Sequence, residues 1–167
     1  PPAFVLYRTA AVWNNVIEDA RVFGPGMAES NNLIFFEGMT YSDHQSVYAQ
    51  VGAAYRNIPR AEYIDAELAL LWGQASGFGL QSEVPCNWGH FIWTYLLRLA
   101  YVKPRLPLLV HTGVPDRFLD WARCMGFSEF VRGADGVTVR RLHVNSVLAH
   151  RDANQVVSVF PAAVHAL

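Results

Sequence analysis

The spacing of apolar residues divides the chain into a β-rich first part and a second part in which helices alternate with strands. Apolar runs at residues 3–12, 19–23, 33–36 and 63–72 predict strands. The Gly-Pro-Gly sequence at 24–26 predicts a turn. The run at 63–72 ends in five consecutive apolar side chains, which is typical of a buried strand. The first part is therefore expected to be mainly β structure.

The second part begins with a predicted helix over residues 87–101. The apolar side chains that recur on one face of this helix are Phe91, Ile92, Tyr95, Leu96 and Leu99. Pro104 ends the helix, and residues 106–110 form a continuous apolar run of the kind found in parallel sheets.

A second helix is predicted over residues 115–125, with a proline at its start and Gly126 as its stop signal. Strands are predicted from Phe130 and over residues 137–148, on either side of a turn at 133–136. The order helix, strand, helix, strand implies βαβ units and a parallel sheet with helices packed on it.

This pattern predicts three segments. Residues 1–75 form a β-rich N-terminal segment that packs on the same domain, and residues 76–152 form a Rossmann-like α/β unit. Residues 153–167 are apolar and end without a capping or stop signal. We expect them to begin a linker to a C-terminal domain that the chain lacks.

The amino-acid composition excludes a disordered chain and argues against some classes of partner. Of the 167 residues, 52% are apolar, which excludes a disordered chain. The net charge of −1 argues against a nucleic-acid partner, because domains that bind nucleic acid are usually strongly basic. Only 16% of residues are charged, too few to cover the surface generously. Part of the surface is therefore expected to face a partner.

Neither a membrane span nor a signal peptide is expected from the sequence. It has no apolar run near the ~20 residues of a membrane span, and its first residues lack the features of a signal peptide. The two cysteines form no CxxC pair and are expected to be buried and reduced. We therefore expect a cytoplasmic protein, with membrane association only through partners.

The sharpest local motif is Asn87-Trp88-Gly89-His90-Phe91, at the start of the first predicted helix. Unpaired N–H groups and the helix dipole make such a position favourable for anions. His90 titrates near neutral pH, so it is a candidate general base or a hydrogen-bond donor to a sugar or phosphate. The alternative, that Trp88 and His90 only pack the helix entry, remains open.

A second candidate follows the strand at 106–110, where His111 and Thr112 precede a helix start. His143 and His150 are more typical of surface or core positions. Arg98 is a candidate partner for a phosphate. No HxxxH, HExxH or Cys/His cluster is present, so no metal site is expected.

These residues resemble a known family, the family-61 glycosyltransferases. Residues 87–91 and the following Leu96 and Arg98 are similar to the family's N-x-x-H-F/W…L-x-R segment. The strand at 106–110 and the helix that ends at Gly126 follow in the family's order. Residues 18–24 also look like its lead-in, so the resemblance covers about residues 15–150.

The resemblance implies a GT-B architecture, in which two Rossmann-like domains face a cleft. This chain would then be the N-terminal, acceptor-side half. The missing C-terminal domain would bind the nucleotide-sugar donor, a co-substrate rather than a cofactor. Such enzymes transfer the sugar to a glycan hydroxyl with inversion and without a metal, in polysaccharide or glycoconjugate biosynthesis. The resemblance places His90 and Asn87 at the cleft and makes Arg98 a helix support or charge partner.

The expected site therefore has His90 as its catalytic residue. The residues expected to bind substrate are Asn87, Trp88, Gly89, Arg98, His111 and Thr112. Thr94 stands where many relatives carry an acidic residue, which favours an alternative: a non-catalytic carbohydrate-binding or protein-interaction module. A small α/β enzyme complete in itself is a third possibility. Without a second domain, the apolar segment 156–167 is expected to be exposed or to mediate self-association.

Overall fold

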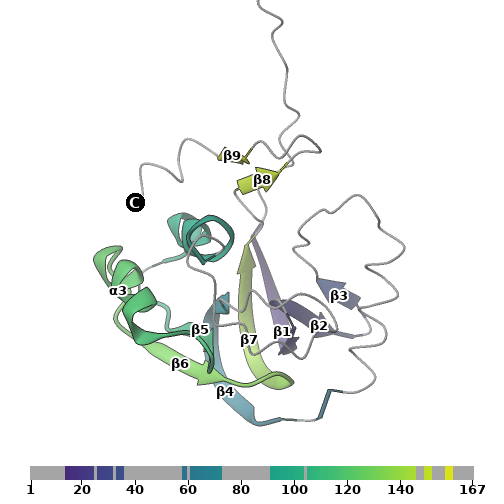
Figure 1. The fold of residues 1–167 in the computed structure, drawn as a ribbon. Helices are drawn as coiled ribbons and strands as arrows, with labels where there is room; N and C mark the ends of the chain where they lie inside the picture. Colours follow the sequence, from purple (N-terminus) through teal and green to yellow (C-terminus); the bar gives the residue numbers. More distant parts are fainter. Residues whose placement is uncertain are drawn as a thin grey trace, which may run out of the picture.

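Most of the strand-forming segments belong to one mixed sheet. The computed structural model describes residues 14–24, 26–31, 33–35, 58–59, 61–72, 91–103, 105–145, 149–151 and 157–159. The strands of the main sheet are β1 (Asn14–Phe23), β2 (Met27–Ser30), β3 (Leu33–Phe35), β4 (Tyr63–Trp72), β5 (Leu108–His111), β6 (Phe130–Gly133) and β7 (Val137–Asn145). Their order across the sheet is β3-β2-β1-β7-β4-β5-β6 (Figure 1). A separate antiparallel pair consists of β8 (Ala149–Arg151) and β9 (Val157–Val159).

The sheet combines parallel and antiparallel pairing. Strands β7, β4, β5 and β6 run parallel to their neighbours. Strand β1 is antiparallel to β7, and β2 and β3 continue the antiparallel pattern to the edge. The prediction of a Rossmann-like parallel-sheet half of a GT-B enzyme is therefore wrong: strands predominate in the described part of the chain, and the sheet is mixed.

Strand β7 is the point at which the two kinds of pairing meet. It lies between β1 and β4, antiparallel to the first and parallel to the second. Only residues 134–136 separate it from β6 in the chain, with no helix between the two strands. The N-terminal strands extend the sheet through the pairing of β1 with β7.

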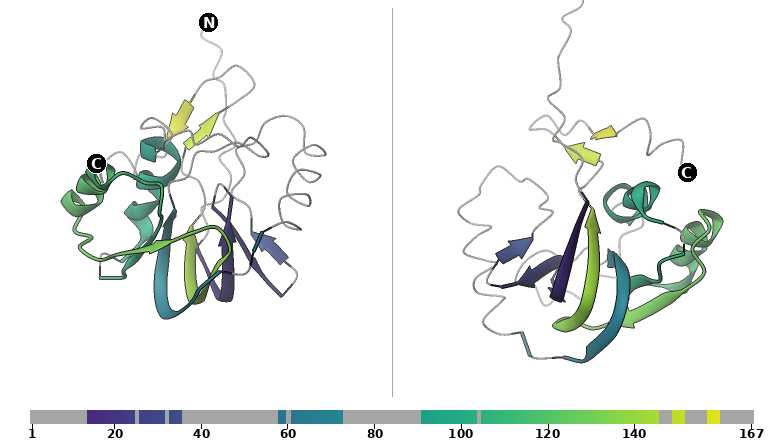
Figure 2. Two further views of the ribbon diagram at one scale, coloured as in Figure 1. Left: turned by 60° about the horizontal axis from the view of Figure 1, so that its bottom comes forward. Right: turned by 180° about the vertical axis from the view of Figure 1, so that it is seen from behind.

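Three helical segments accompany the sheet in the described residues: η1 (Phe91–Tyr95), a π-helical turn, η2 (Leu96–Tyr101), a 3-10 helix, and α3 (Asp116–Cys124). Phe91 of η1 packs against Phe118 of α3 with ring centroids 5.3 Å apart, and both views in Figure 2 show these segments on the same side. None of the described helices is long and apolar enough to cross a membrane.

The predicted helix over 115–125 is confirmed as α3. Pro115 precedes its first residue with an extended backbone, and Gly126 follows it with a φ of 92°. Phe118, Leu119 and Ala122 are buried, as their spacing predicts. The first predicted helix, over residues 87–101, is helical from Phe91 to Tyr101 as η1 and η2, and residues 87–90 lie outside the described part.

Several predicted strands have the expected positions. Strand β4 coincides with the prediction over 63–72, residues 19–23 lie within β1, and residues 33–35 form β3. Strand β5 begins later than the predicted 106–110 and includes His111. The sequence pattern predicts the turn at 24–26 but not strand β2 after it. The predicted strand at 3–12 lies outside the described residues.

The core forms where the last half of β4 meets β5 and the helices. Residues Leu68 through Trp72 are all buried, since both faces of β4 are covered there. The other core side chains of this region include Leu96, Leu99, Leu108, Leu109, Val110, Phe118 and Phe127. This packing fixes the ends of β4 and β5, at Trp72 and His111.

Candidate functional site

The structure describes only part of the predicted site. Asn87, Trp88, Gly89 and His90 lie outside the described residues, so their assignment stays a prediction. The remaining predicted site residues are Arg98, His111 and Thr112. Two of these are consecutive residues at the end of β5, and the third lies in η2.

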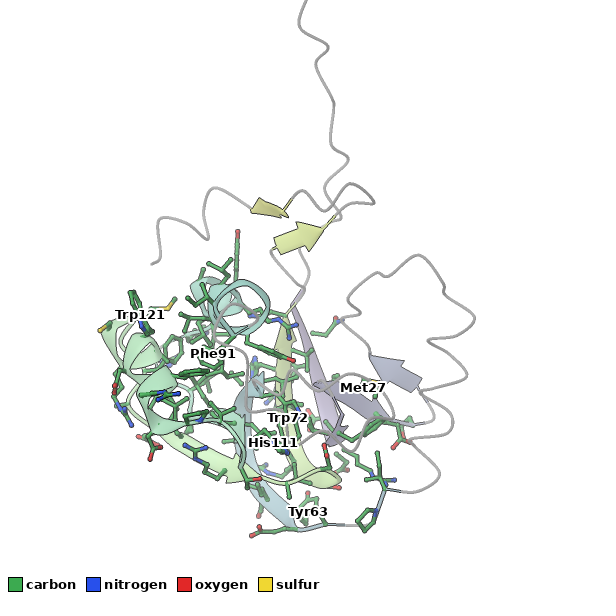
Figure 3. All side chains as sticks on the ribbon, in the orientation of Figure 1. Met27, Tyr63, Trp72, Phe91, His111 and Trp121 are labelled. Carbon is green, nitrogen blue, oxygen red and sulfur yellow. The ribbon has the colours of Figure 1, made fainter. Side chains whose placement is uncertain are left out.

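His111 lies at the carboxyl end of β5, where the β5–α3 loop (residues 112–115) begins. Its ring packs edge-on against Trp72, with ring centroids 5.0 Å apart and an interplanar angle of 66°. Figure 3 shows the two side chains next to each other beside β5. The ends of two neighbouring parallel strands therefore meet at an aromatic contact, the location at which open α/β sheets bind ligands.

Trp72 is held rigidly by the turn between β1 and β2. Its Nε1 atom donates a hydrogen bond to the carbonyl oxygen of Gly24 at 2.6 Å. The amide of Gly24 in turn donates to the Asp135 carboxylate at 2.8 Å. Gly26 lies so close that a Cβ atom there would be 3.5 Å from Trp72 Cδ1. The predicted Gly-Pro-Gly turn thus supports the ring on which His111 packs.

Arg132 of β6 fixes the β5–α3 loop. Its Nη1 atom donates to three backbone carbonyls, those of His111, Thr112 and Val114. Its Nη2 atom forms an ion pair with Asp116, the first residue of α3, at 2.6 Å. One guanidinium therefore joins the last residue of β5 to the first turn of α3. Sequence reasoning missed Arg132, although an arginine between apolar residues of a short strand was a usable signal.

The imidazole of His111 is oriented by its own loop. The Gly113 amide donates to Nδ1 of His111 at 3.0 Å. Burial lowers the pKa of His111 below its ordinary value of 6.5; the Asp135 carboxylate opposes this shift and the Arg132 guanidinium adds to it. The ring is therefore neutral at neutral pH.

Arg98 lies in the interior, with 2% of its surface exposed. Its guanidinium carbon lies 5.2 Å from the ring centroid of Tyr95, and its carbonyl oxygen accepts a hydrogen bond from Asn145 at 3.2 Å. Tyr95 in turn approaches Gly26, since a Cβ built there would be 3.7 Å from Tyr95 Cε1. Arg98 is thus a buried residue beside Tyr95, and its role toward a ligand stays a prediction.

A different histidine forms the closest pair with a carboxylate. His143 of β7 lies 2.6 Å from Glu67 of β4, measured between Nε2 and Oε1. Arg141 lies between Glu67 and Glu18 in the register of β4, β7 and β1, at 3.8 and 3.4 Å from their carboxylates. This pair belongs to the outer face of the sheet and supports the expectation that His143 is structural.

The His143–Glu67 pair predicts acid sensitivity. The hydrogen bond from His143 holds the pKa of Glu67 below its ordinary value of 4.5, burial opposes this shift, and Arg141 adds to it. Because the pKa of Glu67 is lower in the folded state than in the unfolded state, its ionised form stabilises the fold. This stabilisation is fully present above the unfolded-state pKa and is lost as the pH falls through the folded-state pKa. Glu67→Gln should therefore flatten the dependence of the urea midpoint on pH between about pH 5 and pH 3.

Glu129→Gln is the matched control for this measurement, because Glu129 is exposed and forms none of the ion pairs above. It should retain the wild-type slope. Equal slopes for wild type and Glu67→Gln would show that the pair does not couple folding to protonation.

The arrangement around His111 provides hydrogen-bonding groups rather than metal ligands. Among the described residues, no group of three or more His, Cys, Asp or Glu side chains could hold a metal ion. Thr112 is exposed beside His111, with its backbone amide donating to the Gly133 carbonyl at 3.0 Å. Its hydroxyl and the imidazole are suited to contacting the oxygens of a polar ligand.

Comparison with protein-family models, with curated protein sequences and with solved structures found no match to this chain.

Proposed function

We propose that this chain is the acceptor-binding part of a glycosyltransferase that transfers a sugar from a nucleotide-sugar donor to a glycan hydroxyl. The proposal rests on the motif at residues 87–91 and on one observation of geometry. His111 ends β5 and Thr112 begins the loop that Arg132 holds, at the carboxyl ends of two parallel strands. The proposal depends on His111, Thr112 and the motif at residues 87–91, and it does not require a GT-B fold.

Sugar hydroxyls both donate and accept hydrogen bonds, so binding them requires donors and acceptors held at fixed positions. A neutral imidazole and a threonine hydroxyl meet this requirement without a net charge. Trp72 is fully buried, so it supports the His111 ring rather than stacking on a sugar. In this proposal His111 and Thr112 contact the acceptor, and His90 is the candidate base.

Glycan binding provides the direct test. The 167-residue chain is applied to an array of neutral and acidic oligosaccharides, and hits are measured by calorimetry. His111→Ala is expected to weaken binding about tenfold, because one hydrogen bond to a polar ligand is removed. His143→Ala is the matched control, since its imidazole pairs with Glu67 on the outer face of the sheet. Absence of binding to every oligosaccharide would overturn the proposal.

The non-catalytic carbohydrate-binding module remains the second candidate. The position of Thr94 favours it, because many members of the resembled family carry an acidic residue there. Nucleotide release from a panel of nucleotide sugars separates the two functions in the full-length protein. Release that is lost in His90→Ala supports the transferase, whereas glycan binding without any release supports the module.

A further inference from the structure

The orientation of the His111 ring determines which nitrogen can meet a ligand. In a neutral imidazole one nitrogen carries the proton and the other accepts. Nδ1 of His111 accepts the Gly113 amide at 3.0 Å, so the proton of the neutral ring lies on Nε2. Nε2 forms no hydrogen bond with any residue in the described part of the chain. It is therefore an available donor and not an available acceptor.

We propose that His111 acts as a fixed hydrogen-bond donor, presenting Nε2–H to an acceptor oxygen of the bound sugar, and that the Gly113 amide selects this tautomer. This inference rests on the proposed function for the nature of the ligand. It assigns His111 to binding and orienting the acceptor.

The backbone that supplies the Gly113 amide is constrained on both sides. The amide of Val114 donates to the carbonyl of His111 at 3.0 Å, which closes a turn around Gly113. Arg132 binds the carbonyls of His111 and Val114 at the two ends of this turn. The turn therefore cannot rotate its central amide away from Nδ1 without breaking the Arg132 contacts.

The ring itself is constrained by packing. Trp72 contacts it edge-on, and Trp72 is anchored by its bond to Gly24. Burial also lowers the pKa of His111, which keeps the ring in the neutral form that the tautomer argument requires. Protonation would place a second proton on Nδ1, opposite the Gly113 amide, and would remove the hydrogen bond that orients the ring.

A neutral donor has a specific consequence for ligand choice. It contributes a directional hydrogen bond to a hydroxyl, ring or carbonyl oxygen without the charge that would favour an anion. We therefore expect neutral oligosaccharides to be bound through His111 at least as well as acidic ones.

The tautomer can be measured without any ligand. Long-range proton–nitrogen correlation spectra of the 15N-labelled chain, recorded above the ordinary histidine pKa of 6.5, should show Nδ1 of His111 unprotonated and Nε2 protonated. Gly113→Ala provides the matched perturbation, because its Cβ would lie 3.1 Å from Nδ1. It should shift the ring and increase the fraction of the other tautomer. A wild-type spectrum with the proton on Nδ1 would overturn the proposal.

Two substitutions test the donor role in binding. The glutamine amide nitrogen reaches about as far as Nε2, whereas the asparagine amide reaches only as far as Nδ1. His111→Gln should keep oligosaccharide affinity within about threefold of wild type, and His111→Asn should lose about tenfold, like His111→Ala. Equal losses in His111→Gln and His111→Ala would contradict the donor role while leaving glycan binding intact. If no oligosaccharide binds at all, the proposed function fails, and the spectrum alone decides the tautomer.

Discussion

Replacing Gly136 by alanine should lower the free energy of unfolding by about 3 to 4 kcal/mol, the largest effect expected from a single methyl group here. Gly136 has a φ of 88°, which is strained for a residue with a Cβ atom. The added Cβ would also lie 2.3 Å from the carbonyl oxygen of Pro59 and 2.9 Å from Ile58. The first contact is with a backbone atom that must move, and the second is with Cγ2 of the Ile58 side chain.

The cost is large because Gly136 joins three parts of the chain. Its amide donates to the carbonyl of Val22 at 2.8 Å, at the end of β1. Its carbonyl accepts from the amide of Ala61, just before β4. A shift of this residue therefore disturbs the start of β7 together with both of its neighbouring strands.

Gly126→Ala is the matched control for urea denaturation. Gly126 follows α3 with a φ of 92°, nearly the same conformation, but it is exposed. It should lose only about 1 kcal/mol, the cost of the backbone conformation alone. Equal losses at the two glycines would show that the contact with Pro59 does not exist in solution.

Trp72→Phe should destabilise the protein by about 2 to 4 kcal/mol. The substitution removes the Nε1 donor from the Gly24 carbonyl at 2.6 Å and leaves space where the larger ring was fully buried. A partly buried carbonyl that loses its hydrogen bond and an incompletely filled core each cost stability. The loss is measured from urea midpoints at neutral pH.

Trp121→Phe isolates the effect of burial, because Trp121 lies on α3 with 45% of its surface exposed. We expect a change of about 0.5 kcal/mol or less from this substitution. A Trp72 variant that is no less stable than the Trp121 variant would mean that the Gly24 turn does not anchor the Trp72 ring. The support inferred for His111 would then fail as well.

Sequence periodicity predicted the elements whose signal is local. The apolar run predicted the position of β4, because five consecutive apolar side chains are typical of a strand that is buried on both faces. Proline before α3 and glycine after it predicted its bounds, since each residue matches the backbone conformation at its end of a helix. The same pattern predicted His111 and Thr112 between a strand and a helix; His111 is the last residue of β5, and Thr112 follows it.

The local pattern failed where partners are distant in sequence. Helix, strand, helix, strand suggested a parallel unit, but β7 pairs with β1, more than 100 residues earlier in the chain, in antiparallel register. Periodicity reports which side chains are buried and not which strand covers them. Arg132 illustrates the same limit, because its role depends on four contacts to residues 111–116, which lie 16 to 21 positions earlier in the chain.

By itself, the sequence determined the position of β4 and the bounds of α3, because these follow from the spacing of apolar side chains and from the backbone conformations of proline and glycine. The tertiary structure alone decided the mixed sheet and the chemistry of His111. The tautomer of that ring depends on the Gly113 amide, and the orientation of that amide depends on Arg132 from another strand. Arg132 is distant in sequence from this amide, and β7 is distant from β1, so these groups come into contact only when the chain is folded. Composition and spacing therefore do not predict these contacts.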